Sequence, residues 1–231
     1  MIDEYIDKIR NLLIASADDL TKEKALRLTS GAKCIGVPVP VIRQIVKDLK
    51  AEFSNLDFEI LGEIADLFFQ KGCREEILFA IFAMAGQKNN LEKIAWKRIS
   101  SWLNHLDNWE TCDQLSSNIV TPMIVKNPDL LNELFVLTKS ENKWKRRFVA
   151  ATVANLNHEG RAFPKETFVI CRPLLADKEV VVTKAVGWAI REISKKCPEE
   201  TFHFLKENIS VMSKTLLKEA SELLPEKDRI L

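Results

Sequence analysis

Apolar residues recur along the chain at intervals of three and four, the period of one face of an α-helix. In residues 4–15 they include Ile6, Ile9 and Leu13. The same spacing predicts further helices over residues 41–53, 58–70, 74–86, 90–104, 109–118, 128–138, 142–156, 164–175, 179–196, 199–208 and 212–224. The β-prone run 180–182 only opens a longer helical pattern. The pattern therefore predicts an all-α fold without a sheet.

A weak internal repeat indicates that the helices stack in pairs. A polar turn followed by an amphipathic helix occurs twice, and aligning the two copies places Arg147 and Lys184 37 residues apart. Helix-pair solenoids have repeats of about 34–47 residues. Stacked repeats bring equivalent helices side by side and form a concave face. We expect a HEAT-like helical-repeat solenoid, an α-α superhelix, as a single domain over residues 1–231.

Composition narrows the class of protein. Seven glycines and eight prolines are too few for the many turns of an all-β fold. No run of about 18 apolar residues occurs, and the acidic N-terminus does not resemble a signal peptide. The five cysteines lack a CxxC pair and the three histidines lack metal-ligand spacing. We expect a monomeric, cytoplasmic protein with reduced thiols, without a metal or cofactor and without a membrane partner.

The net charge of +1 conceals an asymmetry. Residues 139–196 carry 13 Lys and Arg against 6 Asp and Glu, whereas residues 1–138 carry 16 against 20. A basic segment in a neutral protein indicates an anionic partner, although a solvated basic helix face would have the same composition. The prediction is a positive concave face to which Lys143, Arg147, Lys184 and Arg191 contribute most.

Two tryptophans lie in patterns that could carry chemistry. Trp109 and Asp113 are four residues apart on a predicted helix, so they share a face. Trp188 follows Gly187, which would let another surface approach the backbone closely. Core packing explains an isolated tryptophan equally well. Aromatic rings, cations and one carboxylate together favour binding of sugar and phosphate, with the carboxylate stabilising a cation or orienting water.

Four short elements resemble the AlkD family of DNA alkylation-repair glycosylases. Trp109 and Asp113 resemble its WxxxD element, and residues 144–147 (WKRR) resemble its WxxR element. Residues 184–188 (KAVGW) resemble KAxGW, and residues 36–43 (GVPVPVIR) resemble G(I/V)xxPxxR. The elements occur in the order of the family, between about residues 30 and 192.

This resemblance implies a HEAT-like protein that excises N3- and N7-alkylated purines from duplex DNA, with water cleaving the N-glycosidic bond and without obligatory base flipping. It implies that Asp113 stabilises the developing oxocarbenium ion and positions water, and that Trp109 and Trp188 pack against the deoxyribose and backbone. It also implies that Arg147 holds a phosphate. Arg43, in the N-terminal element, is expected to contact DNA.

Two other functions are compatible with the same residues. One is a DNA-binding relative without turnover, and the other is a HEAT-like scaffold that binds protein. The chain departs from the family over residues 24–33, where an aromatic residue is usual and none occurs here. The contacts on the lesion side are therefore expected to differ from those of the family.

Overall fold

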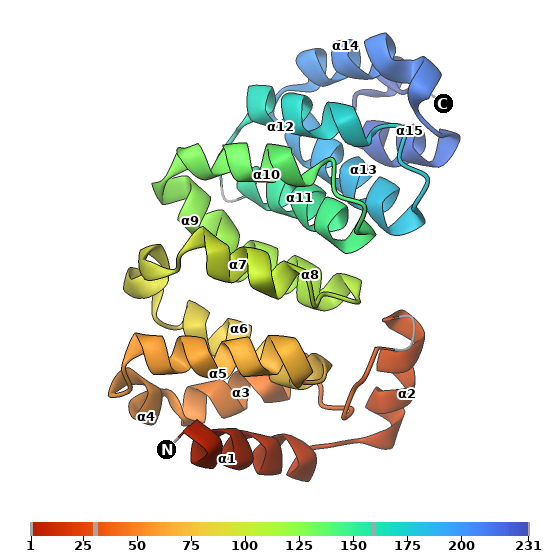
Figure 1. Ribbon diagram of the computed structural model, residues 1–231. Coiled ribbons are helices and arrows are strands. Elements are labelled where there is room, and N and C mark those ends of the chain that lie inside the picture. Colours follow the sequence, from red (N-terminus) through yellow and green to blue (C-terminus); the bar gives the residue numbers. More distant parts are fainter. Residues whose placement is uncertain (1, 30–31, 159, 231) are drawn as a thin grey trace. The chain divides into compact units, whose positions relative to one another are not determined.

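The computed structural model describes residues 2–29, 32–158 and 160–230, and no β-strand occurs in these ranges (Figure 1). The all-α prediction is confirmed. Residues 30 and 31 of the aromatic-free stretch, and Glu159 of the basic segment, lie outside the described residues. The α-helices are α1 Ile2–Ala15, α2 Asp19–Leu28, α3 Val39–Asp48, α4 Lys50–Ser54, α5 Phe58–Lys71, α6 Arg74–Ala85, α7 Trp96–Leu103, α8 Trp109–Leu115, α9 Thr121–Lys126, α10 Leu131–Leu137, α11 Lys143–Leu156, α12 Pro164–Cys171, α13 Val180–Ser194, α14 Pro198–Asn208 and α15 Lys214–Ser221. Within the described ranges, no helix has the length and apolar character needed to cross a membrane.

The apolar period located most of these helices but missed α2 and α9. The sequence of α2 has no strong apolar stripe, and its Leu20 remains 58% exposed. Its start is instead fixed by a cap, because the Asp18 carboxylate accepts a hydrogen bond from Thr21 N at 2.7 Å. Helix α9 has six residues and a proline near its start. Periodicity needs a longer window than α9 offers, so capping and proline position are the better signals here.

Contacts divide the chain into two compact units, Met1–Ile119 and Val120–Leu231. In the first unit α6 is central, packing against α1, α3, α5 and α8, and α5 in turn packs against α7. Helix α6 is buried over most of its length, from Arg74 to Met84. Figure 1 shows α2 standing off to the side of this helix stack. The extent of a single repeat domain over 1–231 stays a prediction.

In the second unit, α11, α13 and α15 pack in a row, with α10, α12 and α14 as their partners. The repeat had aligned Arg147 with Lys184, and these residues lie on α11 and α13, which pack side by side. A Cβ at Gly187 would lie 2.5 Å from Glu219 Cγ. Gly187 therefore permits the close approach of α15 to α13, as the sequence predicted for another surface.

Three consecutive charged residues open α6, and all are buried: Arg74, Glu75 and Glu76. The Glu76 carboxylate accepts from Cys73 N at 2.7 Å and from Arg10 Nε of α1 at 2.6 Å. Arg74 pairs with Glu75 and also with Glu110 of α8. Each side chain therefore fixes α6 to a different part of the first unit, and we call the three residues the α6 hub.

Glu75 holds the segment that precedes α3. Its carboxylate accepts hydrogen bonds from the backbone N–H groups of Ile35 at 2.8 Å and Gly36 at 3.0 Å. Gly36 has a φ of 103°, and a Cβ there would lie 2.6 Å from Lys22 Cβ, so only glycine fits. Burial alone would raise the pKa of Glu75, but these N–H donors and the Arg74 charge outweigh it and lower the pKa.

The α6 hub makes the free energy of unfolding depend on Glu75. Glu75→Gln retains an acceptor but removes one of the two carboxylate charges that pair with the buried Arg74, so it should lower the free energy of unfolding by about 2–3 kcal/mol. Urea unfolding at pH 7 measures this loss. Glu63→Gln, at an exposed position on α5, is the control and should change little.

The loss of unfolding free energy in Glu75→Gln should also depend on pH. Because the pKa of Glu75 is lowered in the folded protein, its contribution is complete above the pKa of the unfolded chain, about 4.3. It disappears as the pH falls through the folded pKa. The difference between wild type and Glu75→Gln should therefore shrink below about pH 4. A constant difference down to the acid transition would contradict the role of the charge.

Candidate nucleic-acid interface

Helix α8 begins at Trp109 because Asn108 caps it. The Asn108 side-chain oxygen accepts from Glu110 N at 3.1 Å and Thr111 N at 3.0 Å. Trp109 and Asp113 are both partly exposed, whereas the intervening Thr111 and Cys112 are buried. The two candidate residues therefore lie on the side of α8 away from the core, as their spacing predicted.

The position of α8 in the first unit is set by charge and polar contacts on both sides. Glu110, adjacent to Trp109, pairs with the buried Arg74 of the hub. Further along the helix, Gln114 Oε1 accepts from Arg43 Nη2 at 3.1 Å. The hub and Arg43 thus hold α8 at its first and second turns.

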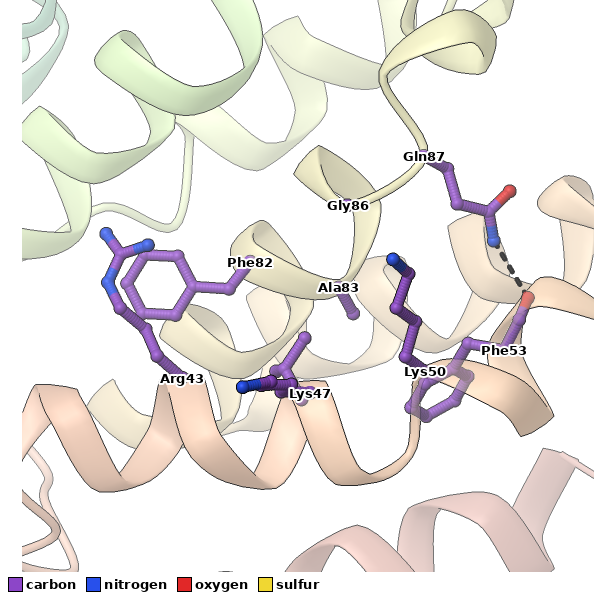
Figure 2. A pocket seen from close by; sticks show the side chains of 9 residues that line it. Arg43, Lys47, Lys50, Phe53, Phe82, Ala83, Gly86 and Gln87 are labelled. Atoms are coloured by element: carbon purple, nitrogen blue, oxygen red, sulfur yellow. Dashed lines mark hydrogen bonds between the residues drawn. The ribbon is translucent and has the colours of Figure 1, made fainter.

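Arg43, the predicted DNA contact of the N-terminal element, lies in an unusual setting for an arginine. Its guanidinium carbon is 3.8 Å from the centre of the Phe82 ring. Burial lowers the pKa of Arg43, and no carboxylate among the described residues pairs with it. Arg43 therefore carries a partly desolvated positive charge. Its guanidinium contacts the Phe82 ring (Figure 2) and the Gln114 amide oxygen.

The side chains of residues 144–147, at the start of α11, point in different directions. The Asn142 side chain caps the helix by accepting from Trp144 N at 2.8 Å. Arg146 binds Asp177 in a bidentate pair at 2.6 and 3.3 Å. Arg147 is 8% exposed and donates to the Val181 carbonyl of α13 at 2.7 Å. The adjacent cations thus point to different partners, as expected for successive positions on a helix.

The candidate residues of α13 share one side of that helix. Lys184, Trp188 and Arg191 follow each other at intervals of four and three, and all are at least partly exposed. Arg191 pairs with Glu219 at 2.5 Å and Glu222 at 2.8 Å, both near α15. Lys184 makes no hydrogen bond or ion pair with the described residues. Lys184 is therefore the predicted cation most available to an external anion.

Much of the charge in residues 139–196 is neutralised locally. Lys143 pairs with Glu179 at 3.3 Å, and Lys195 pairs with Glu192 at 2.6 Å. Together with the pairs of Arg146 and Arg191, these contacts leave a smaller positive surface than the composition indicates. The pairs of Lys143 and Arg191 are partly exposed, so a phosphate can compete for these cations.

No pattern in the sequence pointed to His158, which lies beside Trp188. The two rings are 5.8 Å apart, and His158 Nε2 is 3.2 Å from a carboxylate oxygen of the nearly buried Glu192. Lys196 donates to the carbonyl oxygens of Asn157 and Arg161 close by. His158 follows α11 and Trp188 lies within α13, so only the packing of these helices brings the rings together.

Trp109, Asp113 and Arg43 belong to the first unit, whereas Arg147 and Trp188 belong to the second. That Asp113 lies within reach of Trp188 stays a prediction. The thiols of Cys73 and Cys171 are poor nucleophiles, because burial raises the pKa of each to about 12. No group of three or more His, Cys, Asp or Glu within the described ranges could hold a metal ion.

Comparison with known proteins points to one family. The family model described as "DNA alkylation repair enzyme" matches residues 9–224. The fold is similar to that of a predicted DNA alkylation repair enzyme from Enterococcus faecalis, with 19% identity, a TM-score of 0.72, and 90% of this chain and 96% of the other covered.

Two structures from Streptococcus mutans are also similar. One is AlkD2, with 22% identity, a TM-score of 0.59, and 88% of this chain and 99% of the other covered. The other is smu.31, with 23% identity, a TM-score of 0.55, and 80% and 100% covered. No curated protein matches.

Proposed function

Because the chain belongs to the DNA alkylation repair enzyme family, we propose that it is a DNA glycosylase that excises N3- and N7-alkylated purines from duplex DNA. The observation that carries the proposal is the family match over residues 9–224, which includes all four sequence elements. The exposed side of α8, with a tryptophan and a carboxylate four residues apart, supports it. The reaction is hydrolysis of the N-glycosidic bond, and it does not require the base to leave the helix.

The chemistry follows from the charge of the lesion. An N3- or N7-alkylated purine is cationic, so it leaves with the bonding electron pair as a neutral base. Positive charge then develops on the deoxyribose, where the Asp113 carboxylate stabilises it and orients water. The water oxygen bonds to C1′ and its proton passes to solvent. In this mechanism Trp109 and Trp188 pack against sugar and backbone, and Arg147 holds a phosphate.

The deciding experiment is release of free base. The protein is incubated with methylated duplex DNA, and 3-methyladenine and 7-methylguanine are measured. A DNA-binding relative without turnover would bind this duplex without releasing base. A protein-binding scaffold would show no salt-dependent DNA binding.

Asp113→Asn should preserve shape while removing the negative charge. The expected single-turnover excision rate is lower by about 10²–10⁴-fold, the range for one electrostatic or general-base group. The loss should be smaller for 7-methylguanine than for a less activated base, because a cationic purine leaves as a neutral base and needs less assistance. Asp129→Asn, at an exposed position in the second unit, is the control. Equal rates for wild type and Asp113→Asn would show that Asp113 has a structural role only.

Lys184 should contribute one phosphate contact. Lys184→Met removes the charge but retains the apolar stem, so duplex affinity should fall and the slope of log K against log salt should flatten by about one unit. Lys165→Met, at an exposed position on α12, should leave the slope unchanged. Combining Lys184→Ala with Arg147→Ala should weaken binding further. Unchanged binding by the double variant would place the DNA surface elsewhere.

A further inference from the structure

His158 follows the end of α11 and lies next to Trp188, the predicted sugar contact of α13. The centres of the two rings are 5.8 Å apart, and the rings are tilted by 52°. The His158 side chain is 36% exposed and Trp188 is partly exposed, so a ligand can reach both. A titratable ring therefore lies beside the row of candidate residues on α13, which also includes Lys184 and Arg191.

A nearly buried carboxylate orients the imidazole of His158. The His158 Nε2 atom is 3.2 Å from Glu192 Oε2, and Glu192 is only 7% exposed. Because a carboxylate accepts hydrogen bonds and cannot donate them, Nε2 carries a hydrogen atom. In a neutral ring Nδ1 is then an acceptor, and only the imidazolium form makes Nδ1 a donor. His158 can therefore bind an anion through Nδ1 only when the ring is protonated.

The charged groups around the end of α11 favour a further anion. Lys195 donates to the same Glu192 oxygen at 2.6 Å, so this carboxylate already has a cationic partner. Arg161 and Lys196 donate to backbone carbonyl oxygens at and just beyond the C-terminus of α11, a common position for cations. A protonated His158 adds positive charge to this group, and a phosphate supplies the counter-charge.

The other two histidines lack this setting. His105 and His203 are exposed, and neither pairs with a carboxylate of the described residues. His203 lies beside an aromatic ring, Phe202, at the same centre-to-centre distance of 5.8 Å that separates His158 from Trp188. The nearly buried carboxylate is therefore what distinguishes His158, and His203 offers a matched comparison.

We propose that His158 is a DNA-binding residue that takes up a proton when a backbone phosphate binds beside Trp188. Nε2–H stays directed at Glu192, and Nδ1–H of the imidazolium donates to a phosphate oxygen. The proton comes from solvent. The inference rests on the proposed function, which places a deoxyribose against Trp188, because each deoxyribose within a strand is joined to a phosphate on either side.

Duplex affinity should therefore depend on pH through His158. Only the protonated ring binds the phosphate, so its contribution is complete at low pH and is lost as the pH rises. Between about pH 5 and 8, histidine side chains change charge. Over this range the association constant should fall through His158 by at most about tenfold per pH unit, the limit for one linked proton.

Isothermal titration calorimetry with the full chain and a methylated duplex counts the protons. Binding is measured in two buffers with different ionisation enthalpies, and the difference in heat gives the number of protons taken up. Wild type should take up more protons than His158→Gln, by up to about one per duplex bound. His203→Gln, which removes the exposed histidine beside Phe202, should match wild type.

His158→Arg separates the charge from a structural role. Arginine stays protonated, and its several N–H groups can pair with Glu192 and bind a phosphate together. At pH 8 this variant should bind the duplex at least as tightly as wild type, without the linked proton. A histidine that only packs against Trp188 would instead give the same loss of affinity in His158→Gln and His158→Arg. Circular dichroism verifies that each variant is folded.

Equal proton uptake by wild type and His158→Gln would overturn the proposal. So would a His158→Arg variant that binds no more tightly at pH 8 than His158→Gln. Base release from the methylated duplex is measured in parallel. Linked proton uptake without base release contradicts the glycosylase alone, and base release without linked uptake contradicts the role of His158 alone. Absence of duplex binding contradicts both.

Discussion

The burial of three consecutive charges at the start of α6 is the constraint on which the first unit depends. A buried charge costs several kcal/mol unless a partner compensates it, and the partners of Arg74, Glu75 and Glu76 come from different elements. Arg10 of α1, the backbone before α3 and Glu110 of α8 must all be in place together. Moving any one of them would remove a partner from a buried charge. The helix that carries the candidate carboxylate is thereby held in a fixed direction.

The second unit shows why charge composition is a poor guide to a binding surface. Residues 139–196 have a large excess of cations, yet Arg146 is tied to Asp177 and Arg191 to two glutamates near α15. The first pair ties α11 to the segment before α13 and the others tie α13 to the end of α15, so part of the basic charge stabilises the packing of these helices. The first unit shows the reverse, because a segment with excess acid places Arg43, Lys47 and Lys50 around one pocket (Figure 2).

Periodicity predicted the helices because the features that define a helix lie within a few residues of each other. It failed for α2, whose start depends on a cap, and for α9, which is too short to show a period. The Trp109–Asp113 pair was predictable for the same local reason. His158 was not, since its position beside Trp188 depends on how α11 and α13 pack.

The sequence by itself determined the all-α class, the pairing of helices implied by the repeat of 37 residues, and the faces shared by residues three or four apart. Its four short elements also indicated the family. Only the tertiary structure decided which cations are neutralised and which remain available, because ion pairs such as Arg191–Glu219 join residues on different helices. It also decided that Arg43 meets Phe82, 39 positions later. Such contacts depend on the packing of helices against each other, which spacing along one helix does not specify.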